Sequence, residues 1–407
     1  MDDNEIPQYF ICPISLQIMK DPVTAVTGIT YDRESIEKWL KTAKDITCPV
    51  TKQVLPSGSD LTPNHTLRRL IQAWCTANAS NGIDKVPTPK SPVCKIRLLK
   101  LIREFEVPGL YVNALNKMEV LAKDIERNKK SMEEAGVAKA VILLLIRCYN
   151  ESKTTGVEQA LRILCLIWTP SSEIKDLLNE NHRFIDCLTW ILGCDIENHV
   201  VIKTLAMQTL KQVVEAVTPS PRLLEKLKPE FVKEMLRVLR LKISKQATKS
   251  GLQILIQVCL WGRNKSKMVE ANTIFELIEL ELEKPEKNIS ELIFNLLAHL
   301  CSCAEGRAEF LQHAGSIAMV AKRILRVSAA TDDQAVCILS LISKNAATTE
   351  ILLEMLRVGA VTKLCMVIQA DCPTYLKQKA RGVLRLHSNL WSDSPCIAVY
   401  LLTRYQR

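Results

Sequence analysis

The chain has 407 residues, of which 47% are hydrophobic, 24% are charged and 5% are aromatic, and its formal net charge is +10. This length exceeds what one hydrophobic core usually organises, so we expect two structural units or an elongated array. The apolar fraction excludes disorder over most of the chain and favours a largely helical protein.

The positive charge does not by itself indicate a nucleic-acid-binding protein. Lys and Arg alternate with Asp and Glu along the sequence, and no basic run is interleaved with aromatic residues. We therefore expect solvated helix faces with at most one basic groove, and no nucleic acid as a partner.

The sequence also carries information about the compartment. The N-terminal residues Met1 to Glu5 are acidic and no apolar segment follows them, which argues against a secretory signal. The longest apolar run, Ala140 to Ile146, has about seven residues, far short of the roughly 20 that cross a bilayer. The 15 cysteines are scattered through Leu-rich segments, as expected of reduced, buried thiols. We expect a cytosolic protein without membrane insertion, with the nucleus as an alternative location.

Residues 5–78 hold most of the turn and hairpin signals, so we assign them to a small α+β domain. Two β-like runs, Val23 to Val26 and Ile29 to Tyr31, flank a Thr-Gly turn and predict a hairpin. Asp32 can cap the helix that the apolar spacing predicts over Arg33 to Thr42.

A second helix of this domain is predicted to begin at Thr62 and Pro63, with Thr62 as N-cap and Pro63 at the first helical position. Residues 79–95 then carry three prolines within six residues, which a helix interior does not tolerate. We place an extended, Pro-rich linker there.

Residues 96–392 carry helical periodicity almost throughout, and self-comparison reveals a repeat of about 43 to 47 residues. Equivalent segments begin at Gly136, His182, Pro229, Asn272, Gly315 and Gly359. This period is typical of armadillo and HEAT units, which bury their apolar faces only against neighbouring units. We therefore predict a mainly α chain, in which the small domain is followed by an armadillo or HEAT-like α-solenoid and a tail over 393–407.

The repeat starts leave the subtype open in the middle of the array. Gly136, Gly315 and Gly359 resemble the glycine that precedes the last helix of an armadillo unit. His182, Pro229 and Asn272 depart from that pattern, so the middle units could be HEAT-like.

Two motifs of the first domain have the spacing of a zinc knuckle. CPIS at Cys12 and CPVT at Cys48 each carry a hydroxyl residue where a second cysteine would stand. Two structural zinc ions would need about eight thiolate or imidazole ligands, and the domain adds only His65 and Cys75 to these two thiols. We expect no metal and no cofactor, and instead a RING-like outline held by packing and hydrogen bonds. Candidate members of that network are Ser15, Thr30, Asp32, Thr51 and Asn64.

The first domain resembles the U-box of plant ubiquitin ligases. The resemblance is carried, in order, by IPQYFICPISLQIMKDPVTAVTGITYDRESIEKWL, TCPVTKQVL and LTPNHTLRRLIQAWC. With the repeats behind it, the layout is similar to that of plant U-box proteins with armadillo repeats. The resemblance implies a ubiquitin-protein ligase that binds a ubiquitin-charged conjugating enzyme and promotes transfer to substrate lysines, for degradation or signalling. No catalytic residue of the chain is implied, because the ligase contributes proximity and no covalent intermediate.

The resemblance also implies where the conjugating enzyme binds. Ile14 matches the family's contact residue, Leu16 flanks it, and Trp39 and Pro49 complete an apolar surface that is unusual without a partner. Ile14 and Trp39 could instead be core residues. Lys52 matches a basic position that bridges the conjugating enzyme and ubiquitin, where Lys supplies a point charge and Arg would supply a fork.

Further partners follow from the same resemblance. Substrates are expected in the armadillo groove, and a second copy of the chain on the U-box. Relatives of this layout act in plant immune and drought signalling, which implies a role in stress or defence. From the residues themselves, Thr62 and Thr88 each precede a proline and are candidate phosphorylation sites.

The sequence is also compatible in part with other functions. An interaction scaffold whose U-box has lost its partner is one alternative. A nuclear transport adaptor is another, but the Trp and Asn residues of the repeats are spaced irregularly, which argues against it. A covalent ubiquitin carrier at Cys12 or Cys48 is disfavoured because neither has an evident base nearby.

Overall fold

A computed structural model of the chain describes residues 6–42, 47–56, 61–81, 83–84, 92–180, 182–194, 198–217, 222–392, 394, 395 and 397. The chain divides into two compact units, Met1–Pro92 and Val93–Arg407, and each has its own hydrophobic core. The predicted phosphorylation site Thr88 and most of the predicted tail over 393–407 lie outside the described residues.

The N-terminal unit combines a small antiparallel sheet with two helices. Strands β1 (Pro22–Thr24), β2 (Thr30–Asp32) and β3 (Thr62–Pro63) lie in the order β2-β1-β3. The helices are α1 (Arg33–Thr42) and α2 (His65–Ala77), and two short 3-10 helices are η1 (Gln8–Phe10) and η2 (Ala79–Asn81). The core between sheet and helices contains Met19, Val23, Tyr31, Ile36, Leu55 and Ile71, all of which are buried.

The predicted hairpin and first helix are confirmed. Val23 pairs with Tyr31 in the β1–β2 ladder, and Gly28 in the turn has a φ of 78°, which few other residues adopt. Helix α1 has the predicted bounds. The strands begin or end one or two residues away from the predicted runs, because pairing between strands decides their ends.

The predicted start of the second helix is wrong. Thr62 and Pro63 form strand β3, in which Thr62 pairs with Thr24 and Pro63 with Val23. The helix begins at His65, and the Asn64 side chain caps it by accepting a hydrogen bond from the Leu67 N–H at 3.0 Å. A Thr-Pro pair suits a helix N-terminus equally well, but the free edge of β1 provides a pairing partner here.

The C-terminal unit is helical in its described residues. It begins with α3 (Lys95–Glu104) and α4 (Tyr111–Asp124), and it ends with α23 (Ser388–Trp391). Between them the described chain forms six units of three helices. The short first helices are α5 (Glu126–Glu134), α8 (Ser172–Glu180), α11 (Arg222–Glu225), α14 (Asn264–Glu270), α17 (Ala304–Gln312) and α20 (Thr349–Arg357).

The second and third helices are longer in most units. The second helices are α6 (Val137–Asn150), α9 (Arg183–Gly193), α12 (Pro229–Leu241), α15 (Thr273–Leu282), α18 (Ser316–Arg323) and α21 (Ala360–Gln369). The third helices are α7 (Val157–Ile167), α10 (His199–Val217), α13 (Lys245–Cys259), α16 (Lys287–Leu300), α19 (Ala329–Asn345) and α22 (Thr374–Leu386).

The predicted repeat is confirmed. Every predicted start lies at the first residue of a second helix or directly before it. Gly136 and Gly359 take φ values of 73° and 81°, so glycine suits these two turns for a conformational reason. The middle units have three helices as well, which is the armadillo pattern rather than the two-helix HEAT pattern.

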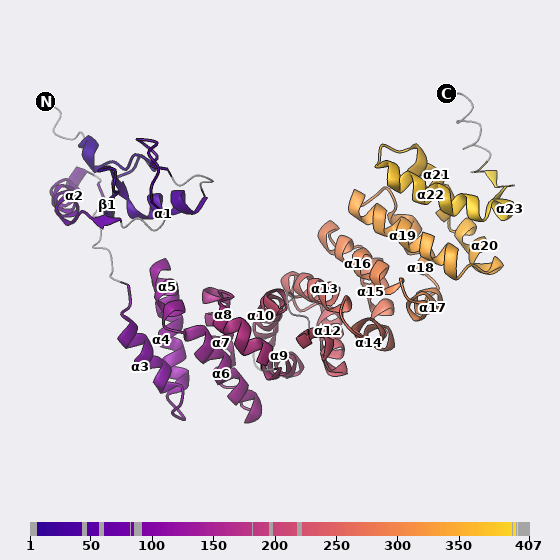
Figure 1. The fold of residues 1–407 in the computed structure, drawn as a ribbon, viewed down its shortest axis with the longest axis horizontal. Coiled ribbons are helices and arrows are strands. Elements are labelled where there is room, and N and C mark those ends of the chain that lie inside the picture. The colour runs from indigo at the N-terminus through magenta and orange to yellow at the C-terminus, as the bar shows by residue number, and fades with distance from the viewer. Residues whose placement is uncertain are drawn as a thin grey trace. The chain divides into compact units, whose positions relative to one another are not determined.

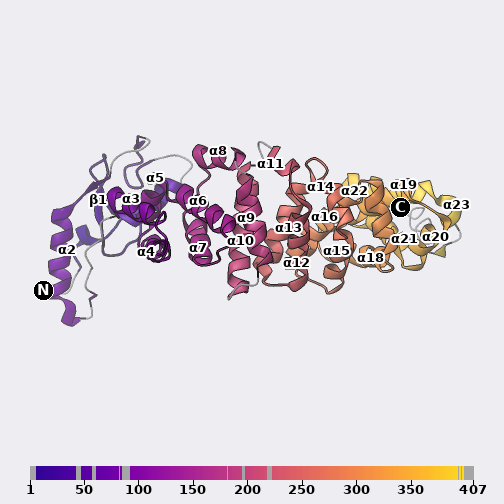
Figure 2. The same ribbon diagram turned by 90° about the horizontal axis from the view of Figure 1, so that it is seen from below.

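Neighbouring units pack through two helical layers. Second helices contact second helices from α6 to α21, and third helices contact third helices from α7 to α22 (Figures 1 and 2). The buried side chains form one continuous core from Leu98 to Trp391. Each unit therefore depends on its neighbours for burial, as in other solenoids.

One contact between neighbouring units is ionic and buried. Glu281 of α15 is fully buried, and its carboxylate lies 2.6 Å from Arg323 Nε of α18 and accepts a hydrogen bond from Ser290 at 3.0 Å. Burial raises the pKa of this carboxyl, and the Arg323 charge opposes that rise. The pairing offsets only part of the desolvation of this carboxylate, whose Oε2 atom has no hydrogen-bond partner among the described residues.

None of the helices in the described part of the chain is both long and apolar enough to cross a lipid bilayer.

Two helix glycines give a matched test of this packing. A Cβ added at Gly306 in α17 would lie 2.0 Å from the Leu300 carbonyl oxygen, whereas one added at Gly382 in α22 would meet nothing within 4 Å. We expect Gly306→Ala to lower the midpoint of thermal unfolding, and Gly382→Ala to leave it unchanged or raise stability by up to about 1 kcal/mol. Circular dichroism melts of the full chain measure both, and equal effects would contradict the packing at Gly306.

Candidate functional site

The first loop of the N-terminal unit is closed by its own backbone. The Cys12 N–H donates to the Gln17 carbonyl at 2.8 Å, and the Leu16 N–H donates to the Cys12 carbonyl at 2.9 Å. Leu16 has a φ of 55°, a conformation that costs an L-residue about 1 kcal/mol or more. Its side chain is 77% exposed, so the loop holds an apolar residue out in solvent.

The second loop repeats this geometry. The Cys48 N–H donates to the Gln53 carbonyl at 2.8 Å, and the Lys52 N–H donates to the Cys48 carbonyl at 2.9 Å. Lys52 has a φ of 61°, so it occupies the position that Leu16 has in the first loop. The two motifs with zinc-knuckle spacing therefore form the same loop twice.

Strand β2 connects the two loops through their cysteine sulfurs. The Asp32 N–H donates to Cys12 Sγ at 3.2 Å, and the Tyr31 hydroxyl lies 2.9 Å from Cys48 Sγ. Thr27 adds a hydroxyl donor to Cys48 Sγ at 3.3 Å. Because Tyr31 and Asp32 are consecutive, one strand fixes both loops at the same end of the sheet.

These contacts change the acidity of the thiols. Burial would raise the pKa of Cys48, but hydrogen bonds from Thr27, Thr51 and Tyr31 outweigh burial and lower that pKa to about 6. Burial, followed by the contact with Cys48, raises the pKa of Tyr31. The Tyr31 hydroxyl therefore stays a donor while the sulfur carries the negative charge.

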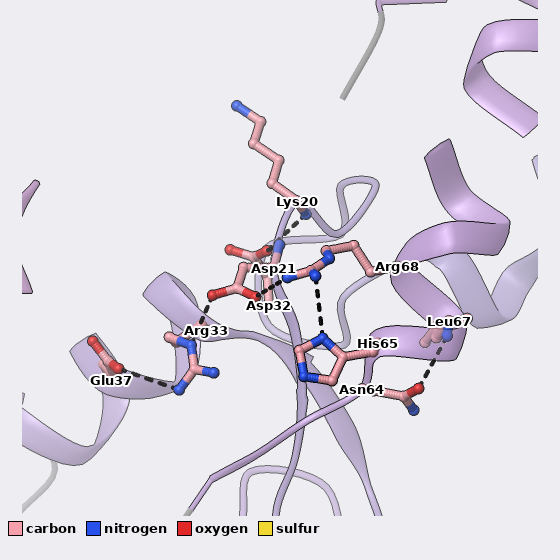
Figure 3. A network of polar contacts seen from close by, with 9 residues as sticks. All are labelled: Lys20, Asp21, Asp32, Arg33, Glu37, Asn64, His65, Leu67 and Arg68. Carbon is pink, nitrogen blue, oxygen red and sulfur yellow. Dashed lines mark hydrogen bonds and ion pairs between the residues drawn. The ribbon is translucent and has the colours of Figure 1, made fainter. Parts of the chain in front are cut away.

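Carboxylates join the remaining parts of the unit (Figure 3). Asp21 lies 2.7 Å from Arg33 Nε of α1 and 3.8 Å from Arg68 Nη1 of α2, so it bridges the two helices. The Asp32 carboxylate accepts hydrogen bonds from the backbone N–H groups of Lys20 and Asp21 at 2.8 and 2.9 Å. The segment before β1 is thus held to β2 and to both helices.

The five predicted members of the network all make polar contacts, and Asp32 is central, because its N–H holds Cys12 Sγ and its carboxylate holds the Lys20 and Asp21 N–H groups. Ser15 hydrogen-bonds Cys12, Thr30 lies 2.9 Å from the Thr24 hydroxyl, and Thr51 donates its N–H to Cys48. Sequence reasoning missed Tyr31 and Thr27 as well as the role of both thiols as acceptors. The CPIS and CPVT motifs could have indicated that both thiols accept hydrogen bonds, because a buried thiol that binds no zinc still needs donors.

The residues predicted to contact the conjugating enzyme lie on the two loops and on α1. Trp39 is half-buried, donates its indole N–H to the Thr47 carbonyl at 3.0 Å, and has Lys52 Nζ 6.0 Å from its ring centre. Pro49 and Ile14 are half-buried beside exposed Leu16. Val50, which was not predicted, is 50% exposed and extends the apolar surface of the second loop.

The positions of the His, Cys, Asp and Glu side chains bear on whether the unit binds a metal ion. Across the part of the chain that the structure describes, no three His, Cys, Asp or Glu side chains gather as a metal site would require. The thiols of Cys12 and Cys48 already accept hydrogen bonds within the unit. A metal-free fold stays a prediction.

The repeats contain a polar groove on the layer of third helices. It crosses α13, α16 and α19 and is lined mainly by amide and charged side chains, namely Lys249, Gln253, Asn288, Glu291, Asn295 and Gln334. The Oε1 atoms of Gln253, and of Gln212 and Gln257 on the same layer, are buried and accept no hydrogen bond from described residues. Such amides can accept hydrogen bonds from a bound chain.

Two family models match the sequence. Residues 6–80 match the U-box domain, and residues 97–407 match the plant U-box protein ARM repeat region. Among curated proteins of Arabidopsis thaliana, the chain is 42% identical to E3 ubiquitin-protein ligase PUB23, over 100% of this chain and 98% of that protein. It is 40% identical to E3 ubiquitin-protein ligase PUB24, over 99% of this chain and 96% of that protein. It is 41% identical to E3 ubiquitin-protein ligase PUB22, over 98% of this chain and 98% of that protein.

Solved structures share the fold at low identity. A structure of Uso1-2 covers 74% of this chain and 52% of its own, with a TM-score of 0.54 and 16% identity. A second structure comes from work on a conserved phosphorylation switch that controls the interaction between cadherin and beta-catenin. The similarity covers 79% of this chain and 58% of that chain, with a TM-score of 0.57 and 14% identity. These similarities concern the fold alone.

The Cys48 thiol makes the stability of the N-terminal unit depend on pH. Its pKa is about 6 when folded and 9.0 in an ordinary cysteine, so between these values the folded state has released a proton that the unfolded state still binds. The free energy of unfolding should therefore rise by about 1 kcal/mol or more from pH 6 to pH 8.5. Urea unfolding of a 1–92 fragment measures this rise.

The matched variants of that measurement are Cys48→Ser and Cys75→Ser. Cys75 is also buried in the unit, but burial raises the pKa of its thiol. We expect Cys48→Ser to reduce the pH dependence and Cys75→Ser to retain it in full. Some dependence remains in the Cys48 variant, because the pKa of the Cys12 thiol is lowered as well. Equal slopes in the two variants would contradict a thiolate at Cys48.

Proposed function

Because the chain belongs to the plant U-box ubiquitin ligases that carry an armadillo-repeat region, we propose that its U-box docks a ubiquitin-charged conjugating enzyme while its repeats bind the substrate. The chain is a U-box ubiquitin-protein ligase by family. The observation that carries the docking proposal is the exposed apolar surface on two backbone-closed loops and α1.

This surface has the features of a protein-binding site. Leu16 and Val50 are 77% and 50% exposed on the two loops, which also carry half-buried Ile14 and Pro49. Trp39 of α1 is half-buried too, and both Ile14 and Trp39 pack partly against the core of the unit. Apolar residues grouped in this way on a soluble protein usually mark an interface. The two loops are closed by hydrogen bonds, so little conformational entropy would be lost when a partner binds. A scaffold that had lost its partner would have no need to keep this surface apolar.

The chain itself supplies no nucleophile to this reaction. Cys12 and Cys48 are fully buried and engaged in hydrogen bonds, so neither sulfur can receive ubiquitin without unfolding of its loop. Transfer then runs from the thioester of the conjugating enzyme to a substrate lysine. The ligase holds the two together, and such proximity can accelerate a reaction by several orders of magnitude.

Lys52 is proposed to support the bound ubiquitin. Its ammonium group lies over the Trp39 ring, 6.0 Å from the ring centre, where a cation–π contact can hold it beside the proposed docking surface. Because the group is exposed, it can leave the ring and pair with a carboxylate of the bound enzyme or of ubiquitin. A Lys makes this contact as a point charge.

Substrates are proposed to bind in the groove over α13, α16 and α19. Its lining mixes amides with two charges, Lys249 and Glu291, and the buried Oε1 atom of Gln253 lacks a donor among the described residues. An extended peptide segment could provide an N–H group to this oxygen. A role in plant stress or immune signalling and a cytosolic or nuclear location are further proposals, which rest on the resemblance to the family.

Self-association of the U-box is proposed through the side of α2. Leu70 of α2 is 52% exposed and Tyr9 is 64% exposed. The Phe10 ring lies 4.8 Å from that of Tyr9 and 5.8 Å from that of Trp74, which is one helical turn from Leu70. A second copy would cover both exposed residues. Thr62 lies exposed on β3, shortly before α2, which places a candidate phosphorylation site near this surface.

Substitution of Ile14 tests the docking surface. We expect Ile14→Ala to reduce ubiquitin-chain formation at least about tenfold, because a central apolar contact is lost in the interface. The measurement is an in vitro reaction with activating enzyme, conjugating enzyme and ubiquitin. Ile96→Ala is the matched control, since Ile96 is 80% exposed on α3 in the repeat unit. Full activity of the Ile14 variant, or equal loss in both, would contradict the proposal.

Substitution of Thr62 tests the link between phosphorylation and self-association. A phosphate would add roughly two negative charges close to a surface that is otherwise apolar. We expect Thr62→Glu to shift the mass measured by light scattering from dimer toward monomer, with Thr62→Ala remaining like the wild type. An unchanged mass in the Glu variant would remove this role.

A further inference from the structure

The layer of second helices carries a cleft that the proposed function does not use. It lies between α9 and α12, with Tyr149 of α6 at one end, and has a volume of about 540 Å³. These three helices are consecutive neighbours in the layer (Figure 1). The substrate groove is formed by third helices instead, so the two sites belong to different layers of the array.

Aromatic side chains form one side of this cleft. The Trp190 and Tyr149 rings are 5.7 Å apart and tilted by 57°, and both side chains are half-buried. Phe231 of α12 also lines the cleft and is buried. The cleft thus presents a half-exposed aromatic face, which attracts cations through its quadrupole.

Carboxylates supply the other side. Four charged residues line the cleft, of which Asp186, Glu230 and Glu234 are acidic and Lys228 is basic. Lys228 is already paired with Asp186 at 2.7 Å. This leaves the cleft negative, although the whole chain has a net charge of +10.

Glu230 and Glu234 are one helical turn apart on α12, so both side chains lie on the same face. The Glu234 Oε2 atom is buried and accepts no hydrogen bond from a described residue, and Arg237 is 3.7 Å away from it. A Cβ at Gly193 would lie 3.3 Å from Glu234 Cδ, so the absence of a side chain lets this carboxylate rest against the end of α9. The Glu234 Oε2 atom therefore has the Arg237 charge nearby but no hydrogen-bond donor among the described residues.

We propose that this cleft binds an arginine side chain from a partner protein, with the guanidinium against Trp190 and its N–H groups donating to Glu230 and Glu234. Arginine fits better than lysine because its planar group stacks on an aromatic ring while it donates to carboxylates in its plane. A hydrogen bond from it would also satisfy the free Glu234 oxygen. Arginine binding in this cleft does not depend on ubiquitin transfer, because the cleft would bind arginine with or without a working U-box.

The test uses the full chain with 5-fluorotryptophan at its six Trp positions, and Trp190→Phe identifies the Trp190 fluorine resonance. The probes are N-acetyl-arginine methylamide and its neutral isostere N-acetyl-citrulline methylamide, at low ionic strength. We expect the arginine probe to shift the Trp190 resonance saturably, and the citrulline probe to bind at least about fivefold more weakly.

Two variants complete the test. Glu230→Gln combined with Glu234→Gln should weaken the arginine probe by at least about fivefold, because the charge is lost while size and hydrogen-bonding capacity are retained. Glu291→Gln, which changes a carboxylate in the other layer, should leave the titration unchanged. The proposal would be overturned if the two probes bound equally well or if the Trp190 fluorine resonance did not shift with the arginine probe. It would also be overturned if the double variant bound the arginine probe as the wild type does.

Discussion

The U-box of this chain depends on two buried sulfur atoms that accept hydrogen bonds from neighbouring residues of one strand. Cys12 is held by the Asp32 N–H and Cys48 by the Tyr31 hydroxyl, so β2 ties the two loops together through their sulfur atoms. Each buried acceptor has its donor, which is the condition for such a network to stabilise a fold. The two loops are also closed by their own backbone hydrogen bonds, and they carry exposed Leu16 and Val50.

The sequence predicted the repeats and most of the U-box elements, for different reasons. A solenoid repeats one local pattern many times, so a period of about 43 to 47 residues averages over the irregular middle units. Helix α1 was predicted with its correct bounds because an apolar stripe marks it. The Asp32 carboxylate, which was predicted to cap this helix, accepts hydrogen bonds from the backbone N–H groups of Lys20 and Asp21 instead. Strand β3 was missed because it has two residues and exists only through its pairing with β1.

The site was predictable only in part. Ile14, Leu16, Trp39, Pro49 and Lys52 could be placed from resemblance, and the structure puts them on two equivalent loops and one helix. The sulfur contacts could not be foreseen, because whether a thiol finds donors depends on residues 17 to 20 positions away along the chain, such as Tyr31 for Cys48 and Asp32 for Cys12. The cleft at Trp190 likewise combines three helices from three units, which no local pattern reveals.

The contacts of the repeat array run between neighbouring units, layer by layer. Elastic deformation of such an array is distributed, since a slight rotation at each interface leaves every local contact intact while the ends move considerably. A groove built in this way can change its curvature with little cost at any single interface. The array can therefore bend as a whole, with the deformation shared among all of its interfaces.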